Sequence, residues 1–557
     1  MVGKILHVLN REISGLHEAA YLLGFFTLLS QTLGFLRDRI LAHTFGASVE
    51  LDMYYSAFRI PDLIFVSVAS IVSVSVLVPF IIERLEKSEL EIRRFLDSIF
   101  SFFFLFIIVV SAAVFIATPW LLHMIFPGIA NSENGSMFIL MTRIMLISPI
   151  LLGFSNLFAS IAQAKHRFVS YALSPIFYNI GIIVGVIFFY NRLGIVGLAL
   201  GVVLGSFLHF ACQLFSIRKP IPSFRLFLDF GIIKNVIGLS FYRTLALSGS
   251  QISTLILIAI AARLSSGSVA IFNFAWNLQS VPLSLFGVSY TVALFPTISR
   301  LFGAGKRQKF LEEMTIAVRH ITFWSVPVIV LFIVLRAQIV RTVLGSGNFD
   351  WTDTRLTAAA LAIFSVSILA QSLILLFVRG YYAGGNTKKP LIINFLSAVL
   401  VVVFSFGFLK LFRESDFFRY FVESLFRVSE IVGNEVLMLP LGFSVAMIIN
   451  ASIFWFYFAR RSPNFSPQAN KTFFEVFSAS VIMGFISYKL LNVFDNIFNI
   501  NTLSGIFLQG FISGIIGIVA GVTVLVLLKN KEIKEVWATL HHKIWKAKVI
   551  VPEQESL

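Results

Sequence analysis

The stretch of sequence that decides the fold is residues 34–62, which read GFLRDRILAHTFGASVELDMYYSAFRIPD. Four charged side chains lie inside its apolar runs, namely Arg37, Asp38, Arg39 and Arg59. A charge near the centre of a lipid bilayer costs about 2.5 to 3.5 kcal/mol on insertion scales, so charged residues in membrane spans normally face a polar cavity. The stretch therefore predicts a membrane protein with a hydrated interior.

The composition of the whole chain agrees with a membrane protein. Of the 557 residues, 57% are hydrophobic, 62 are Phe and only 13% are charged. A soluble core of this length needs fewer apolar residues. Apolar runs of roughly 20 residues, separated by polar or Gly/Pro punctuation, give about 14 spans. The predicted fold class is an all-α integral membrane protein.

The distribution of basic residues predicts the orientation. The amino terminus, every second loop and the carboxyl-terminal tail hold about 27 Lys and Arg, against about 10 on the other side, which places both termini in the cytoplasm. The net charge of +16 is spread over separate loops. This pattern indicates contact with anionic membrane lipids, and we expect no nucleic-acid partner.

Enzyme chemistry finds little support in the sequence. There is no His-Glu-x-x-His metal motif and no nucleotide-binding Gly-rich loop followed by Lys-Ser or Lys-Thr. The only cysteine, Cys212, excludes a disulfide and a cysteine metal site. Asp350 and Asp353 follow a Gly-rich stretch and are typical of turn and helix-cap chemistry. We therefore expect a protein that is not an enzyme and holds no cofactor.

An internal repeat organises the chain. One offset of 221 residues relates two sets of residues, Gly46, Asp52 and Pro61 in the first set and Gly267, Asn273 and Pro282 in the second. The same offset relates Ala162 to Ala383, and each of these precedes a basic loop. Such matches suggest duplicated bundles of about six spans in the same orientation, although chance matches of small residues are the alternative. Halves of this kind typically close around a central site, as in transporters with alternating access.

The repeat, the spans and the charges together predict the domain organisation. The predicted parts are an interfacial helix at 1–19, an N-lobe at 20–225, a C-lobe at 226–465, a final span pair at 466–530 and a basic cytoplasmic tail at 531–557.

Ordered motifs through most of residues 25–400 carry a family resemblance. After the opening stretch come PLSLFG at 282–287, ALFP at 293–296 and YAGGNT at 382–387. In this order and spacing the chain resembles the lipid II flippases, the MurJ/MviN family of the MOP transporter superfamily, as a divergent member. The resemblance implies about 14 helices, in two six-helix lobes around a central cavity and a last helix pair that forms a groove for a lipid tail.

The resemblance also implies the substrate and the location. The substrate would be undecaprenyl diphosphate carrying the disaccharide-pentapeptide precursor of peptidoglycan. The protein would move it from the cytoplasmic to the outer leaflet of the bacterial inner membrane, for cell wall synthesis. We expect a monomer.

The charged residues suit such a substrate independently of the resemblance. A diphosphate headgroup needs fixed positive charge, and Arg offers a permanently charged, two-pronged donor for phosphate oxygens. Arg37 and Arg59 are the leading candidates. Asp38 and Asp52 either orient the guanidinium groups or form ion pairs that exchange during transport. The structural alternatives are a helix-end ion pair for Arg37 and a cap of the second span for Asp52.

The chain departs from the family pattern at several positions. The family usually has Arg at the positions of Gln31 and Asn277, and a basic pair at 65–66. Arg243 and Arg263 on or beside the seventh span are candidates to replace that charge. The full set of candidate substrate-binding residues is Arg37, Asp38, Arg39, Asp52, Arg59, Arg243, Arg263 and Asn277.

The sequence favours voltage over sodium as the driving force. The seventh span offers only Gln251, Ser253 and Thr254 as polar groups where some relatives hold a cation, which disfavours a sodium site. Moving one net negative charge outward gains about 2.3 kcal/mol per 100 mV of inside-negative potential. Two other classes of function remain open. One is a related exporter of another lipid-linked oligosaccharide or of drugs, and the other is a non-transporting scaffold.

Overall fold

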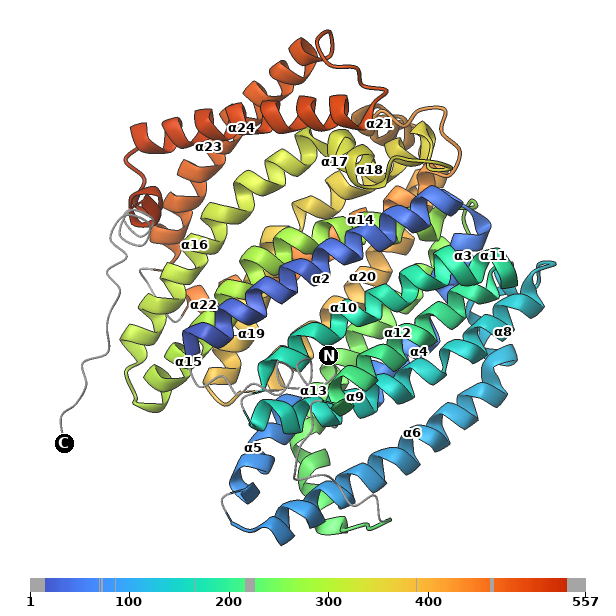
Figure 1. The fold of residues 1–557 in the computed structure, drawn as a ribbon. Helices are drawn as coiled ribbons and strands as arrows, with labels where there is room; N and C mark the ends of the chain where they lie inside the picture. Colours follow the sequence, from blue (N-terminus) through green and yellow to red (C-terminus); the bar gives the residue numbers. More distant parts are fainter. Residues whose placement is uncertain are drawn as a thin grey trace, which may run out of the picture. The chain divides into compact units, whose positions relative to one another are not determined.

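The computed structural model describes residues 16–69, 71, 74–85, 87–165, 167–215, 226–386, 388–460 and 465–537, and Figure 1 shows the path of the chain. Throughout these residues the regular structure is helical and contains no strand. The predicted all-α fold class is therefore confirmed. The predicted interfacial helix at 1–19 lies mostly outside the described residues, as does the tail beyond residue 537.

Many of the described helices are long and apolar enough to cross a membrane. Ten meet that description, or eleven if the bent pair α18 (Trp351–Val366) and α19 (Ile368–Ala383), which meet at 41°, counts as one span. The chain is thus a multi-pass membrane protein, and the number of about 14 spans stays a prediction.

The chain forms two compact units. The first draws its residues from 1–278, 343–364 and 386–447, and the second from 279–342, 365–385 and 448–557. Four of the five boundaries between the units fall inside helices, and the fifth, at 385/386, lies between α19 and α20. The predicted lobe boundaries at 225 and 465 stay predictions.

The first unit begins with a long helix followed by a sharp turn. Gly46 follows helix α2 (Leu16–Phe45) directly and precedes α3 (Val49–Ala57). Gly46 has a φ of +63°, and a Cβ there would lie 2.5 Å from the Asn348 carbonyl oxygen. A left-handed backbone conformation at so close an approach requires glycine. The turn therefore depends on this residue.

The other helices of the first unit pack around α2 and α3. They are α4 (Arg59–Ile64), the π-helix η1 (Phe65–Ala69), α5 (Val74–Leu85), α6 (Glu89–Ile125), α7 (Pro127–Ala130), α8 (Gly135–Met145), α9 (Ile147–Ala164), α10 (Phe168–Val184), η2 (Gly185–Phe189), α11 (Tyr190–Leu193), α12 (Val196–Phe215), α13 (Phe230–Ala261), most of α14 (Ser268–Pro282), most of α18, α20 (Lys388–Glu414), α21 (Asp416–Phe426), η4 (Asn434–Leu437) and the start of α22 (Met438–Ala459).

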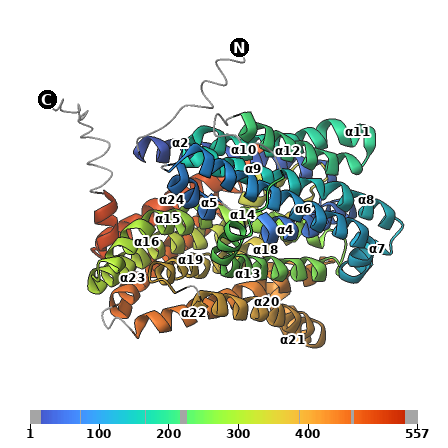
Figure 2. The ribbon, with the colours of Figure 1, turned by 90° about the horizontal axis from the view of Figure 1, so that it is seen from below.

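Helices α10 and α12 lie side by side in backbone contact (Figure 2). A Cβ on Gly181 would lie 2.2 Å from the Cα of Gly205, and a Cβ on Gly201 would lie 2.6 Å from the Cα of Gly185. Small residues at such positions allow helices in a membrane to approach closely. This packing fixes the position of α10, which carries polar residues of the candidate site.

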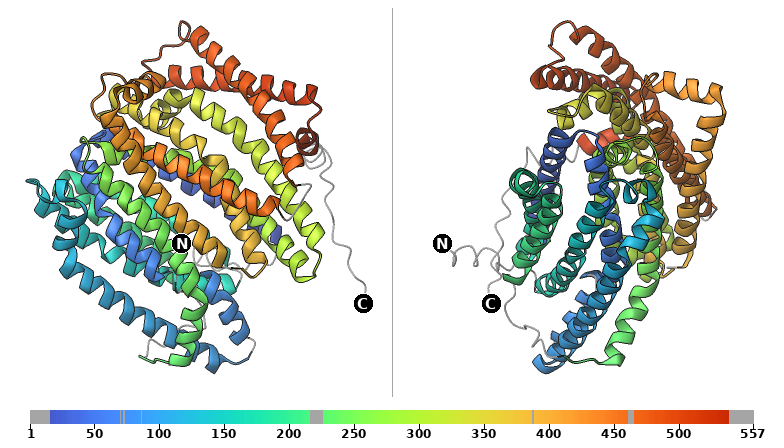
Figure 3. Two further views of the ribbon diagram at one scale, coloured as in Figure 1. Left: turned by 180° about the vertical axis from the view of Figure 1, so that it is seen from behind. Right: turned by 90° about the vertical axis from the view of Figure 1, so that its right-hand side faces the viewer.

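The second unit contains the remaining helices. They are the end of α14, the π-helix η3 (Leu283–Val288), α15 (Ser289–Gly303), α16 (Arg307–Val334), most of α17 (Arg336–Leu344), α19, the end of α22, α23 (Phe465–Phe494) and α24 (Leu503–Leu527). Helices α23 and α24 pack on each other and are drawn in orange to red in Figure 3. Helix α16 packs along α23.

A buried acidic residue holds the segment after α24 in place. Glu532 is 1% exposed, and its Oε1 accepts hydrogen bonds from Arg319 Nε at 2.6 Å and from Thr472 Oγ1 at 2.9 Å. Nearby, the fully buried side chain of Asn530 donates to Glu475 Oε2 at 2.8 Å. These bonds join the segment to α16 and α23. They form a polar lock beside an apolar cluster of α16, α23 and α24.

The lock changes the acidity of Glu532. Burial alone would raise the pKa of this carboxyl group, but the hydrogen bonds from the backbone and Thr472 and the charge of Arg319 outweigh it and hold the pKa below its ordinary value. A carboxylate whose pKa is lower in the folded state adds stability above its unfolded pKa of about 4.3. That stability is lost as the pH falls through the folded pKa.

We predict that Glu532→Gln lowers the melting temperature of the purified protein at pH 7. The neutral side chain leaves Arg319 largely buried without a counter-charge, a loss on the order of 3 kcal/mol. The difference from wild type should shrink only as the pH falls through the lowered folded pKa, where wild-type Glu532 becomes neutral too. Thermal denaturation in detergent at pH 7, 5, 4 and 3 measures this.

The matched control is Glu414→Gln, which breaks an exposed pair with Lys410. Exposed pairs contribute at most about 1 kcal/mol, so this variant should melt close to wild type. Equal melting of Glu532→Gln and Glu414→Gln at pH 7 would contradict a stabilising lock.

Candidate functional site

The first part of the candidate site is an ion pair on α2 with partners on two other helices. Arg37 donates to Asp38 Oδ1 from Nε at 3.0 Å and from Nη2 at 2.8 Å. Its Nη1 donates to Asn179 Oδ1 on α10 at 3.1 Å. The second carboxylate oxygen of Asp38 accepts from Asn277 Nδ2 on α14 at 2.9 Å. The pair therefore joins α2, α10 and α14, and both oxygens of Asp38 are occupied.

The second part of the site is Arg59 at the start of α4. Its Nη2 donates to Asn273 Oδ1 on α14, and Asn273 donates in turn to the Val269 carbonyl at 2.7 Å. Asp62 acts on Arg59 electrostatically from the same short helix. The Nε of Arg59 is buried and has no hydrogen-bond partner among the described residues. A buried N–H without a partner is costly, and a ligand oxygen would satisfy it.

The third part of the site is a helix cap that joins two distant segments. Asp52 is 5% exposed; its Oδ2 accepts from the Gly267 N–H at 2.7 Å and its Oδ1 from the Ala270 N–H at 2.8 Å. A carboxylate at this place satisfies the free N–H groups of α14 and interacts favourably with the helix dipole. The cap of the second span is Ser48, whose Oγ accepts from the Leu51 N–H at 3.4 Å. Asp52 thus caps α14 and not its own helix.

The turn after α2 is held by a second set of bonds. Asp353 on α18 accepts from the Ala47 N–H at 3.0 Å, and Asn348 Nδ2 donates to the Thr44 carbonyl at 2.7 Å. Asp350 Oδ1 accepts from the Asp353 N–H at 2.8 Å, which is the predicted cap chemistry of that pair. The bond from Ala47 was not predicted, because nothing in the sequence indicates which loop meets the turn.

The remaining candidates are more scattered. Arg39 donates from Nη1 to the Val343 carbonyl at 3.2 Å. Arg263 is exposed in the turn after α13. Arg243 lies on α13, but its side chain is outside the described residues. Neither Arg243 nor Arg263 can therefore be placed with the other charges, and their binding role stays a prediction.

The charges of the site nearly balance. Residues 34–62 hold three arginines against three aspartates and Glu50. Arg37 is matched by Asp38, so a ligand with negative charge must compete with that carboxylate or bind beside it. Arg59 differs, because its closest partner is a neutral amide and it keeps a free N–H. Two polar residues that the sequence analysis did not assign to the site, Asn179 and Asn273, orient the two guanidinium groups.

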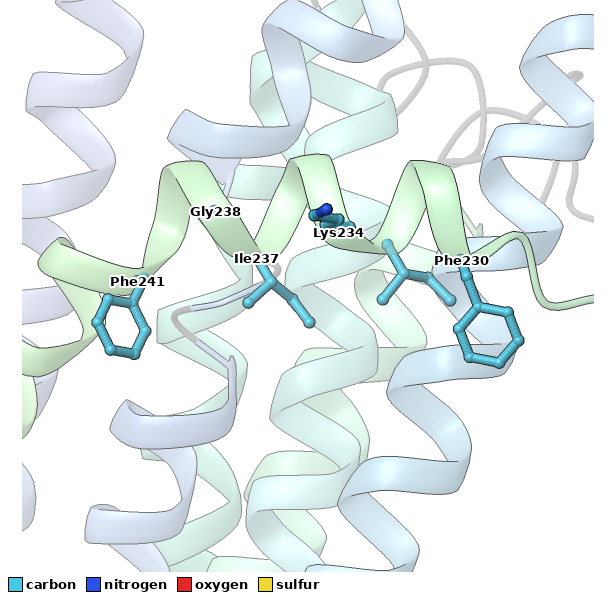
Figure 4. A pocket seen from close by; sticks show the side chains of 6 residues that line it. Phe230, Lys234, Ile237, Gly238 and Phe241 are labelled. Atoms are coloured by element: carbon cyan, nitrogen blue, oxygen red, sulfur yellow. The ribbon is translucent and has the colours of Figure 1, made fainter.

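A separate groove of about 520 Å³ runs along α13 (Figure 4). Phe230, Ile237, Gly238 and Phe241 line it together with a single cation, Lys234. All of these residues belong to one helix. The groove lacks the converging polar groups of a headgroup site.

Comparison with known proteins identifies relatives along most of the chain. The family model described as lipid II flippase MurJ matches residues 41–509. A protein of Thermotoga maritima, named as a probable lipid II flippase MurJ, is 27% identical over 523 residues, which cover 93% of this chain and 97% of that protein. The lipid II flippase MurJ of Burkholderia cenocepacia is 26% identical over 68% of this chain and 75% of its own length.

Solved structures give the same fold. A lipid II flippase MurJ in an inward closed conformation matches with a TM-score of 0.71 and 24% identity, over 94% of this chain and 99% of that one. An inward-facing multidrug resistance MATE family transporter of the MOP superfamily matches with a TM-score of 0.64 and 15% identity, over 78% and 96%. At these identities the structural likeness shows the fold alone.

We predict that Asp52→Asn loosens the first turn of α14. The amide offers one acceptor oxygen and no charge, so the cap weakens by about 1 kcal/mol. Hydrogen exchange of residues 267–272, followed by mass spectrometry, should become several-fold faster. Ser48→Ala is the matched control because it removes the side-chain cap of α3 and leaves the bonds of Asp52 to α14 in place. Unchanged exchange at 267–272 in Asp52→Asn would contradict the cap.

Proposed function

Because the chain belongs to the lipid II flippase MurJ family, we propose that it moves lipid II from the cytoplasmic to the outer leaflet by alternating access, with Arg37 and Arg59 as ligands of the diphosphate. The family match across residues 41–509 confirms the resemblance given by the ordered motifs. The observation that carries the ligand assignment is the buried Arg59 Nε, which has no partner among the described residues.

The surroundings of both arginines support diphosphate binding. Charge-assisted hydrogen bonds from guanidinium groups to phosphate oxygens are short and about twice as strong as neutral ones. Asn179 accepts a hydrogen bond from Arg37, and Asn273 accepts one from Arg59. Each amide thus restricts the orientation of its own guanidinium partner. Pre-oriented donors lose less conformational entropy when the ligand binds. Arg37 would release Asp38 when it binds the ligand, whereas Arg59 would form an additional hydrogen bond from its Nε.

The bonds of Asp52 and Asp353 fit a gate in this cycle. They join residues 46–52 to the segments that follow the predicted spans at 232–262 and 320–344, and the alternation of basic loops puts these segments on the outer side. While the bonds hold, the outer side stays closed and the substrate enters from the cytoplasm. Their breakage would accompany the outward-open state, as interface contacts exchange in other switching proteins.

The energy source and the setting complete the proposal. The membrane potential drives export, because each net negative charge that moves outward gains about 2.3 kcal/mol per 100 mV. The protein works as a monomer in the bacterial inner membrane with both termini in the cytoplasm and with anionic lipids around its basic loops. Helices α23 and α24 carry the prenyl tail. No observation favours drug export, since the MATE likeness concerns the fold alone.

The direct test of this function is complementation. The full chain should restore growth in cells depleted of their own flippase, and it should restore lipid II in the outer leaflet, measured by its accessibility to an externally added enzyme. Growth without outer-leaflet lipid II, or neither despite normal membrane insertion, would exclude the proposed substrate.

We predict that Arg59→Gln abolishes transport in this assay while the protein still inserts and folds. Glutamine keeps a hydrogen-bond donor for Asn273 but removes the positive charge and the fork that binds phosphate. Arg59→Lys should recover little activity, because lysine keeps the positive charge but lacks the fork that binds phosphate. Arg37→Ala should also inactivate, although it leaves the buried Asp38 with Asn277 as its remaining partner.

The matched control is Arg413→Gln, which breaks an exposed pair with Glu435 and should transport at the wild-type rate. Full activity of Arg59→Gln would remove Arg59 from the diphosphate site.

A further inference from the structure

Helix α21, which the proposed mechanism does not use, has one apolar side that packs on the protein. Phe418, Val422 and Phe426 recur every four residues, so they lie on one side of the helix. Val422 is 3% exposed, and the ring of Phe418 stacks on Phe408 of α20 with 6.1 Å between the ring centroids. This side holds α21 against the end of α20 (Figure 2).

A second apolar side of α21 is exposed. Its members recur at intervals of three or four residues and are each more than half exposed, namely Phe417, Tyr420, Phe421 and Leu425. The charged residues of the helix are confined to the remaining arc. There Arg419 pairs with Asp416 at 2.7 Å, and Glu423 accepts from Asn434 Nδ2 at 2.9 Å. A contiguous exposed apolar face of this kind marks contact with a partner or a membrane.

The packing on α20 sets the depth of α21 in the membrane. Helix α20 is long and apolar enough to cross a bilayer. It has no charged residue from 390 to 409, a run of about 30 Å at about 1.5 Å per residue, which matches the hydrocarbon core. Lys410 follows the run directly. Phe408 therefore lies at the edge of the hydrocarbon core, and Phe418, which stacks on it, places α21 at the same level.

Helix α20 shows that lipid surrounds this part of the first unit. Exposed apolar side chains follow one another along it at intervals of three or four residues, namely Ile392, Phe395, Val399, Val403 and Phe406. Such a stripe on a membrane-spanning helix faces acyl chains, which are as apolar as leucine. The stripe reaches to within one turn of Phe408. Lipid is thus the partner nearest to the exposed side of α21.

Polar contacts hold α21 in one orientation. The Oγ of Ser415 accepts from the Phe418 N–H at 3.3 Å and caps the start of the helix. At the other end, Arg355 Nε on α18 donates to the Arg427 carbonyl at 3.1 Å. The bond between Glu423 and Asn434 joins the charged arc to η4. The exposed side is therefore formed before any partner binds, which reduces the entropy lost on binding.

We propose that α21 is an interfacial helix, whose exposed apolar side inserts into the phospholipid bilayer where headgroups meet acyl chains. Helices of this kind lie in the membrane plane with the apolar face about 5–10 Å into that boundary. Tyr420 suits the position, because its ring enters the apolar layer while its hydroxyl stays among polar groups. The predicted orientation, with the basic loop before α20 in the cytoplasm, assigns α21 to the outer leaflet. Inserted there, α21 holds the end of α20 at a constant depth.

Spin labels on single cysteines test this in the full-length protein, reconstituted in nanodiscs of phosphatidylethanolamine and phosphatidylglycerol. Phe417→Cys and Phe421→Cys carry the label on the exposed apolar side. Asp416→Cys is the matched control, because it places the label on the charged arc of the same helix. Val399→Cys on α20 is the reference for a label in lipid. Cys212 is buried, and wild type treated with the same reagent measures its background labelling.

Power-saturation electron paramagnetic resonance measures collisions of each label with oxygen, which concentrates in hydrocarbon, and with a nickel chelate, which stays in water. The ratio of oxygen to nickel collisions should be severalfold higher at 417 and 421 than at 416, toward the value at 399. Equal ratios at the three positions of α21 would overturn the proposal, because the apolar side would then have no preference for lipid. Exclusion of both reagents at 417 and 421 would also overturn it, since protein, such as a second copy of the chain, would then cover this side.

Discussion

The burial of charge in an apolar protein is the constraint on which the site depends. An unpaired ion in a low-dielectric interior is too costly to keep, so each buried acid needs a partner for each oxygen. Asp38 finds them in Arg37 and Asn277, and Asp52 finds them in the backbone N–H groups that begin α14. Because several of these partners lie on other helices, the requirement to satisfy the charges also determines which helices of the first unit stay together.

Positions related by the 221-residue offset of the predicted repeat have reciprocal tasks. Gly46 and Gly267, 221 residues apart, both adopt a left-handed conformation between two helices, with φ of +63° and +83°. A Cβ on Gly267 would lie 2.3 Å from the Ala47 carbonyl oxygen, so this turn also requires glycine. Six residues after each glycine stands a polar residue that reaches into the other half of the sequence. Asp52 caps α14, and Asn273 binds Arg59. The two positions thus share a backbone turn and differ in side-chain chemistry, as the predicted duplication would require.

The sequence predicted those features that depend on composition and local pattern. The all-α membrane fold, the charged residues of the opening stretch and the cap chemistry of Asp350 needed no knowledge of which helices meet. The partners Asn179 and Val343 could not be predicted, because apolar helices of similar composition offer no signal for their neighbours. The lock at Glu532 was missed for another reason. Counting basic residues marked 531–557 as a cytoplasmic tail and hid the role of Glu532, which pairs with Arg319.

In the proposed binding mode, the two arginines would contribute differently to the binding energy of a headgroup. A ligand shifts a conformational equilibrium only by the difference in its affinity for the two states. At Arg59 a ligand would satisfy a free N–H and break no bond, so its binding there would favour no rearrangement. At Arg37 it would compete with Asp38, and a displaced Asp38 would keep Asn277 as its partner on α14. Binding at Arg37 would therefore change the bonds between α2 and its neighbours, which makes Arg37 the candidate through which an occupied site would act on the helices around it.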